Sequence, residues 1–234
     1  MSPRFDAGSS CRDGDAQPSV RADRPTASLL GTLGASRLGG RSREASERMS
    51  DVASYISELR HTVTVAGLNY EIWWVYKGSD TRPSYLQTMN RYTPFFNTSL
   101  HAHFVATLVA LYRLYETRND TFNVPKLLDR VRSERLFQAS DFKRIQDLHD
   151  RAIPLWKKVA ILRNKAFGHR STAHTVDDVF TEAKVSPNEL KHLMEITKQL
   201  LNEISRAHDH SVHAFNLGAR EAAIRLLDDL KGVK

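Results

Sequence analysis

The sequence IQDLHDRAIPLWKKVAILRNKAFGH, residues 145–169, carries a regular apolar seam that predicts a long α-helix. Its members recur alternately three and four residues apart, which is the spacing of one helix face. They are Ile145, Leu148, Ala152, Leu155, Val159, Leu162, Ala166 and His169. Pro154 lies inside the run and is expected to kink or divide the helix, because an interior proline costs about 3 kcal/mol. Every seam member before His169 is apolar, so this face is expected to meet other helices or a second subunit.

Upstream of this seam the periodicity is also helical. A stripe of apolar residues from Val52 to Trp73 predicts a first long helix, with Ser50 as its N-cap. Residues 61–67 and 70–76 also alternate as strands do, but no turn signal separates them, so helix is favoured. Residues 99–115, SLHAHFVATLVALYRLY, are apolar almost all round, which predicts a central buried helix.

Start signals divide the remaining sequence into further helices. Ser186 is followed by Pro187 at the first helical position and by Glu189, which completes a capping box. Other expected starts are Pro83, Asn97, Pro125, Ser140 and Thr175, and a final helix is expected over residues 223–230. The sequence therefore predicts an all-α fold, an antiparallel helical bundle of about six to eight helices.

The first 48 residues differ in composition from the rest of the chain. They contain 8 of the 34 basic residues and no Lys, Ile, Trp, Tyr, Asn or His, and they are rich in Arg, Ser, Ala and Gly. Such a segment buries too little apolar surface to offset its ordering entropy. We therefore expect residues 1–48 to be a disordered tail or an upstream extension that lacks a secretory or transit signal. Residues 49–234 are expected to form one helical domain of a cytoplasmic protein.

Composition and motifs exclude several classes of site. The single cysteine, Cys11, rules out an internal disulfide framework and a cysteine-based zinc cluster. No glycine-rich phosphate loop, Ser-His-Asp signature or metalloprotease helix motif occurs. His101 and His103 are two residues apart and point to different helix faces, and the spacing of His208, His210 and His213 does not gather three ligands on one face. No metal and no cofactor are therefore expected.

Arg163, Asn164 and His169 form the one polar group at the end of the apolar seam. Arg163 precedes His169 by six residues, about 120° around a helix, so the two side chains lie on adjacent faces. A half-buried histidine satisfied by a neighbouring carbonyl is one interpretation. The other is a histidine at the mouth of a cleft, where its ordinary pKa of about 6.5 suits proton transfer while Arg163 reaches a phosphate. Two copies of the helix across a dimer would also build one shared site.

The motif RNKAFGH in this setting resembles the HEPN superfamily. Ribonucleases of that superfamily carry an arginine, usually followed by a polar residue, with four to six residues before a histidine; five residues separate Arg163 from His169. The ordered segments FFNTSLHAHF, LYRLYE, VPKLL and LRNKAFGHRS resemble the branch related to the abortive-infection AbiU proteins. The resemblance covers residues 52–206.

This resemblance implies a metal-independent endoribonuclease that acts in phage defence (abortive infection) or as a toxin. Arg163 would hold the phosphate, His169 would move the proton, and Asn164 would orient either group. Lys165 and Arg170 would contact RNA. The implied partners are RNA, a second copy in a homodimer and a neutralising protein, with no membrane.

The net charge of +7 favours an anionic partner only modestly. The alternative is a non-catalytic HEPN-like helical module that binds RNA, a nucleotide or a protein partner, which Gly168 beside His169 favours.

Overall fold

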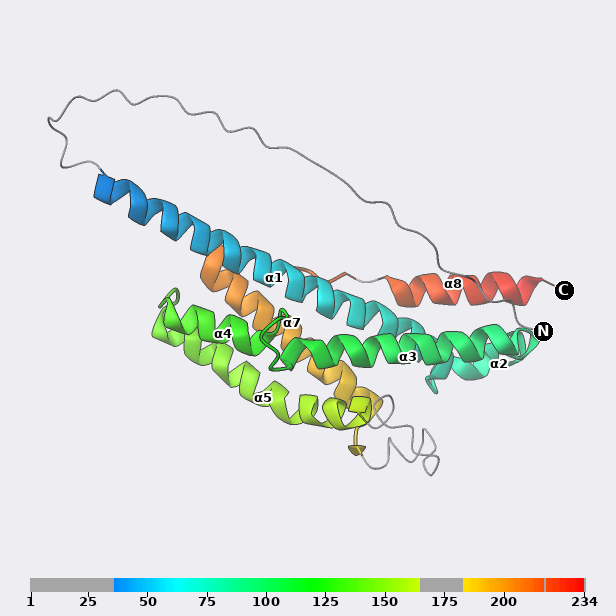
Figure 1. Ribbon diagram of the computed structural model, residues 1–234. Coiled ribbons are helices and arrows are strands. Elements are labelled where there is room, and N and C mark those ends of the chain that lie inside the picture. The colour runs from blue at the N-terminus through cyan, green and yellow to red at the C-terminus, as the bar shows by residue number, and fades with distance from the viewer. Residues whose placement is uncertain (1–35, 165–182, 217, 234) are drawn as a thin grey trace, which may run out of the picture. The chain divides into compact units, whose positions relative to one another are not determined.

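A computed structural model describes residues 36–164, 183–216 and 218–233, with side chains described from Asp51 onward (Figure 1). This part of the chain contains seven helices and no strand, so the predicted all-α fold is confirmed. The helices are α1 (Ser36–Lys77), α2 (Arg82–Arg91), α3 (Thr93–Tyr115), α4 (Val124–Ser133), α5 (Ala139–Arg163), α7 (Pro187–Asp209) and α8 (Ala219–Gly232).

The start of α1 lies well upstream of the expected one. The helix begins at Ser36, so Ser50 lies within it and does not cap its start. The chain divides into two units, residues 1–42 and 43–234, and the packing described below belongs to the second. The proposed boundary between a tail and a helical domain at residue 49 stays a prediction.

α3 is the central buried helix that the sequence predicts. Its largest fully buried side chains are Leu108, Leu111, Leu114 and Tyr115, each at most 1% exposed. α3 packs against α2, α4 and α5, and Phe104 meets Trp73 of α1 with ring centroids 5.3 Å apart. The faces of α3 that meet these helices are buried, whereas Val109 and Arg113 on the same helix are exposed.

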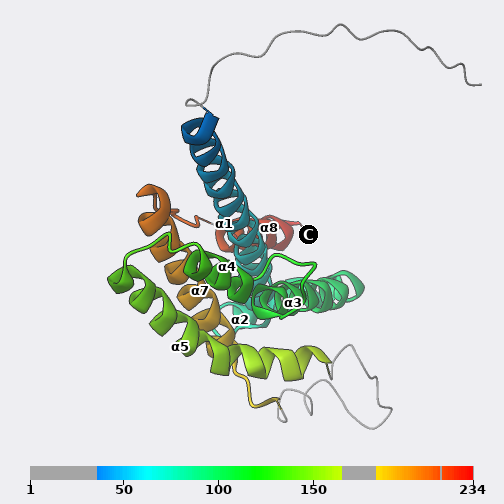
Figure 2. The same cartoon turned by 60° about the vertical axis from the view of Figure 1, so that its left-hand side comes forward.

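α5 and α7 form an antiparallel pair. Arg144 pairs with Glu203 at one end and Lys158 pairs with Glu189 at the other, and these pairs lie fourteen residues apart on both helices. The two pairs are therefore about 21 Å apart along each helix, and they show the register in which the two antiparallel helices pack. α5 continues through Pro154 without a break, and Figure 2 shows that the helix bends about midway. Pro154 therefore does not divide the helix.

Several helix starts differ from the expected ones. α3 begins at Thr93, with Pro94 in its first turn, and so includes Asn97. α5 begins at Ala139, one residue before Ser140, and no side chain caps it. Asn123 caps α4 by accepting a hydrogen bond from the Lys126 backbone N–H at 2.9 Å, ahead of the expected start at Pro125. Proline in a first turn costs nothing, because its missing N–H would have no helical partner there.

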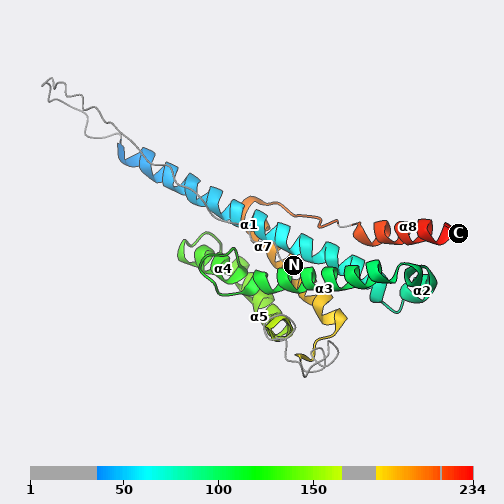
Figure 3. The same ribbon diagram turned by 45° about the vertical axis from the view of Figure 1, so that its right-hand side comes forward.

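A second, smaller apolar cluster joins the end of α1 to α2, α3 and α8 (Figure 3). Its buried members are Val75, Tyr76, Met89, Phe96, Ala223 and Leu227. On α8 the buried leucine is Leu227, whereas Leu226 is 44% exposed. Glu71 of α1 accepts hydrogen bonds from the backbone N–H groups of Ala219 and Arg220, so α1 also satisfies the N-terminus of α8.

One buried polar contact joins α3 to α7. The Tyr115 hydroxyl lies 2.8 Å from the Thr197 hydroxyl, and both residues are at most 1% exposed. The single hydrogen of Thr197 is donated to the Leu193 carbonyl at 2.7 Å, so Tyr115 donates to Thr197. Burial raises the pKa of the Tyr115 phenol, which keeps the group protonated and a donor.

This pair predicts unequal costs for its two partners. Thr197→Val leaves the buried Tyr115 donor without an acceptor and is expected to lower the free energy of unfolding by about 1–3 kcal/mol. Tyr115→Phe leaves Thr197 still bonded to Leu193 and is expected to cost about 1 kcal/mol. Denaturant unfolding of both single variants and of the double variant measures the coupling. Equal costs, or strict additivity in the double variant, would contradict the assigned donor.

Candidate functional site

Arg163 is the last residue of α5, and it lies half-buried where α5 faces α3. Asn164 still has helical backbone angles (φ −65°, ψ −37°), and its N–H reaches the carbonyls of Ala160 and Ile161. The helical path therefore continues through Asn164. Two consecutive polar side chains are held by a regular backbone at the place where the apolar seam ends.

Two contacts hold the Arg163 side chain. One guanidinium nitrogen donates to the Asn164 side-chain oxygen at 3.0 Å. The guanidinium carbon lies 4.7 Å from the centroid of the Tyr112 ring on α3, which is cation–π geometry. Within the described residues Arg163 forms no ion pair, so its positive charge is not neutralised by a carboxylate there. A held but uncompensated arginine is suited to binding an anion.

Trp156 supports Tyr112. Its ring stacks on the Tyr112 ring with centroids 6.0 Å apart and an interplanar angle of 28°. The Trp156 indole N–H donates to the Tyr112 backbone carbonyl at 3.0 Å. The aromatic ring beneath Arg163 is therefore fixed both by its own helix and by α5.

The structure describes two of the five predicted site residues. It brings Arg163 and Asn164 into hydrogen-bond contact, as expected if Asn164 orients the arginine. Lys165, His169 and Arg170 lie outside the described residues. The seam that ends at His169 is buried or half-buried at its described members as far as Leu162, so the predicted inward face of α5 is confirmed that far.

The start of α7 lies beside the end of α5. The predicted capping box is present: the Ser186 hydroxyl accepts from the Glu189 backbone N–H at 3.2 Å, and Glu189 accepts from the Ser186 backbone N–H at 2.7 Å. Glu189 also pairs with Lys158 of α5. The hydrogen bond from Lys158, followed by that from the Ser186 N–H, lowers the pKa of the Glu189 carboxyl below its ordinary value.

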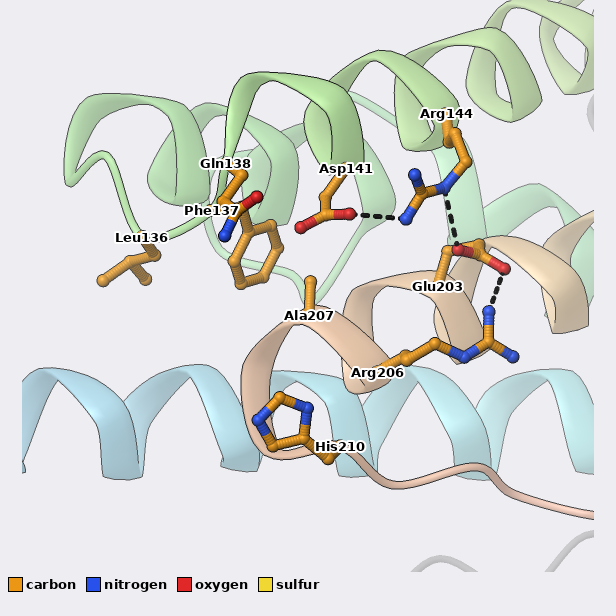
Figure 4. Close-up of a pocket in the computed structure, with 9 residues that line it drawn as sticks. All are labelled: Leu136, Phe137, Gln138, Asp141, Arg144, Glu203, Arg206, Ala207 and His210. Carbon is orange, nitrogen blue, oxygen red and sulfur yellow. Dashed lines mark hydrogen bonds and ion pairs between the residues drawn. The ribbon is translucent and has the colours of Figure 1, made fainter.

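A cavity of about 360 Å³ lies at the other end of the α5–α7 pair (Figure 4). Arg144 pairs with Asp141 and Glu203, and Arg206 also pairs with Glu203. Leu136, Phe137, Gln138, Ala207 and His210 complete its lining. Both arginines of this cavity are engaged with carboxylates, whereas no carboxylate among the described residues pairs with Arg163.

The histidines singled out in the sequence have separate surroundings. The His103 ring nitrogen lies 2.8 Å from the Asn69 side-chain oxygen, and burial lowers the pKa of His103, whereas His101 is exposed. The His208 side chain on α7 is 5% exposed, and His210 ends that helix in a left-handed conformation (φ 60°). Among the described residues no group of three His, Cys, Asp or Glu side chains is arranged to hold a metal ion. None of the helices described is long and apolar enough to cross a membrane.

Tyr112 and Trp156 are contacts of the site that sequence analysis missed. Trp156 precedes Arg163 by seven residues, two helical turns, so the sequence does place both on one face of α5. No comparable signal exists for Tyr112, because its partners lie on another helix.

Comparison with known proteins identifies one family. The HEPN family model described as AbiU2 matches residues 49–226, which is most of the chain and includes α2 to α5 and α7. No curated protein and no solved structure matches the chain.

Substitutions in the capping box test how much the Ser186 and Glu189 contacts stabilise the fold. Ser186→Ala is expected to lower the free energy of unfolding by about 1 kcal/mol, because one N-terminal N–H of α7 loses its acceptor. Glu189→Gln keeps a side-chain acceptor but loses the charge that faces Lys158. Denaturant unfolding at several pH values measures both.

The pH dependence follows from the lowered pKa of Glu189. A carboxyl whose pKa is lower in the folded state stabilises the fold above its unfolded pKa, about 4.3, and this contribution is lost as the pH falls through the folded pKa. The stability difference between the native protein and Glu189→Gln should therefore be largest near neutral pH and vanish in acid. A difference that is constant from neutral pH to below pH 3 would contradict the role of the carboxylate.

Proposed function

The chain belongs to the AbiU2 family of HEPN domains, a branch associated with abortive infection, and from this premise we propose that it is a metal-independent endoribonuclease. Its biological role would be phage defence or toxicity to the cell that makes it. The proposal assigns phosphate binding to Arg163 and proton transfer to His169, with Asn164 as the residue that orients the arginine.

The observation that carries the proposal is how the Arg163 guanidinium is held. The guanidinium is held by Tyr112 and Asn164, and within the described residues no carboxylate neutralises it. A planar cation with free N–H donors binds a phosphodiester through two hydrogen bonds and stabilises the charge that develops on it. The family match extends across the motif that contains both Arg163 and His169.

The chemistry uses groups that RNA itself supplies. The 2′-oxygen attacks the adjacent phosphorus while its proton passes to a base, and the bond from phosphorus to the 5′-oxygen breaks as that oxygen takes up a proton. The products are a 2′,3′-cyclic phosphate and a free 5′-hydroxyl. A histidine in this role contributes about 10²- to 10⁴-fold in rate. DNA lacks the 2′-hydroxyl and is not cut by this route.

Further cations support a nucleic acid as the partner. Arg113 follows Tyr112 on α3 and Lys157 follows Trp156 on α5, and both side chains are exposed. In the described part of the chain neither forms an ion pair. They provide positive charge on the two helices that hold the Arg163 contacts, where an RNA backbone would pass.

The first test is cleavage of an end-labelled RNA by the purified full chain. We expect cutting of RNA, with and without EDTA, and no cutting of DNA of the same sequence. Arg163→Ala removes phosphate binding and His169→Ala removes the proton carrier, so each variant is expected to lose at least about 100-fold in rate. Product analysis should find cyclic phosphate and 5′-hydroxyl ends.

Lys191→Ala is the control, because Lys191 is an exposed cation on α7 outside the proposed site. It should cut RNA at the native rate, and thermal melts should show that all variants are folded. A folded His169→Ala protein that cuts RNA at the native rate would refute the assignment. RNA binding without cleavage by the native protein would favour the non-catalytic module.

We also propose that the functional form is a homodimer. Ile161 on α5 is 43% exposed and Val109 on α3 is 39% exposed, and each lies within one helical turn of a member of the Arg163–Tyr112 contact. Exposed aliphatic side chains on two helices that pack together suit a contact with a second copy of the chain. In such a dimer the C-terminal ends of α5 from both copies would lie in one cleft.

Ile161→Glu is expected to weaken this dimer by about 10-fold or more, because it places a charge in an apolar contact. Light scattering at micromolar concentration measures the mass, and RNA cleavage should fall with the dimer fraction. Leu226→Glu on α8 is the matched control, since Leu226 is 44% exposed and lies on another helix. A native protein that is strictly monomeric would rule out a shared cleft.

A further inference from the structure

Three side chains form a continuous stack between α3 and α5. The Trp156 ring lies against the Tyr112 ring, with 28° between their planes, and the Arg163 guanidinium lies 4.7 Å from the Tyr112 centroid. Tyr112 thus touches both residues, which are two turns apart on α5. Its contacts reach across the helix interface to the end of α5.

Trp156 holds Tyr112 in place independently of Arg163. The Trp156 ring packs against the Tyr112 ring, and the Trp156 indole N–H donates to the backbone carbonyl of Tyr112 at 3.0 Å. The residues on both sides of it in α3 that face the core, Leu111 and Leu114, are fully buried. A ring fixed in this way is a rigid surface for a long and otherwise flexible side chain at a helix end.

An aromatic ring holds an arginine differently from a carboxylate. A carboxylate would accept the guanidinium N–H groups and cancel the charge, as Asp141 and Glu203 do for Arg144. The face of Tyr112 attracts the cation through its ring electrons, so it uses none of the N–H donors and leaves the charge in place. Asn164 accepts from one guanidinium nitrogen, and no other described residue accepts from the remaining donors.

We propose that Tyr112 is a positioning residue for Arg163: stacked on Trp156, it holds the guanidinium ready to bind the scissile phosphate of RNA without neutralising it. This inference rests on the proposed function for its consequence in RNA binding. The contact itself is a property of the free protein. Preorganisation of this kind improves binding because the arginine loses less rotamer freedom when the phosphate arrives.

The contact is tested first in the absence of RNA. In the native full chain, with labelled arginine and tyrosine, the side-chain protons of Arg163 should show nuclear Overhauser effects to the ring protons of Tyr112. The ring current should also shift the Arg163 signals, and the shift should persist in Tyr112→Phe and disappear in Tyr112→Leu. Absence of these effects in the native protein overturns the proposal, and this measurement requires no RNA and no cleavage.

The consequence is tested with an RNA in which every 2′-hydroxyl is methylated, so that it binds without being cut. Tyr112→Leu is expected to raise the Kd by about 2- to 30-fold, the range of cation–π interactions, and Tyr112→Phe should restore the native value. In the Arg163→Ala background the same leucine substitution should have no further effect, because the residue that Tyr112 positions is already gone.

Phe142→Leu is the matched control, because it removes a similar contact, with the Arg132 guanidinium carbon 4.9 Å from the Phe142 centroid. It should leave the Kd unchanged. Equal losses on Tyr112→Leu in the native and Arg163→Ala backgrounds would show a general structural role and overturn the proposal. A native protein that shows the Arg163–Tyr112 contact but does not cut RNA would refute the proposed function and leave the positioning of Arg163 supported.

Discussion

The antiparallel register of α5 on α7 is the constraint on which the rest of the structure depends. Lys158–Glu189 and Arg144–Glu203 mark this register at the two ends. Exposed or partly exposed ion pairs contribute at most about 1 kcal/mol each, so the pairs report the register more than they create it. The apolar faces create it, because Val159 and Leu162 on α5 and Leu190 and Leu193 on α7 must be buried together.

The two ends of the α5–α7 pair differ in the groups that contact their arginine side chains. At the Arg144 end, arginines and carboxylates alternate around the cavity and neutralise one another. At the Arg163 end, an aromatic ring and an amide hold the guanidinium, and the described residues supply no counter-charge. Arginine is therefore paired with carboxylates at one end, and at the other end its described neighbours are an aromatic ring and an amide. The chemistry of the neighbours makes this difference.

The proposed activity places few demands on the fold. Cleavage through the 2′-hydroxyl needs a phosphate-binding fork and a group that moves a proton, both held near the RNA backbone. A helix end that is fixed by packing on two neighbours supplies the first of these with little further machinery. In the proposed assignment both groups come from one short segment of sequence, Arg163 to His169, and α3 and α7 pack against the helix that ends at Arg163.

Local patterns in the sequence determined the helical class, the inward face of α5, the capping box at Ser186 and the resemblance to the HEPN superfamily. Each depends on residues close together along the chain, and hydrogen bonding within one helix enforces it. The true start of α3 was missed because a proline such as Pro94 can either begin a helix or end the one before it, and the start of α5 was missed because no side chain caps it. Only the tertiary structure decided that Leu227 and not Leu226 faces the core, and that Tyr112 lies beneath Arg163. The physical reason is that such contacts join residues far apart in sequence, and the packing of whole helices, which no short pattern encodes, brings them together.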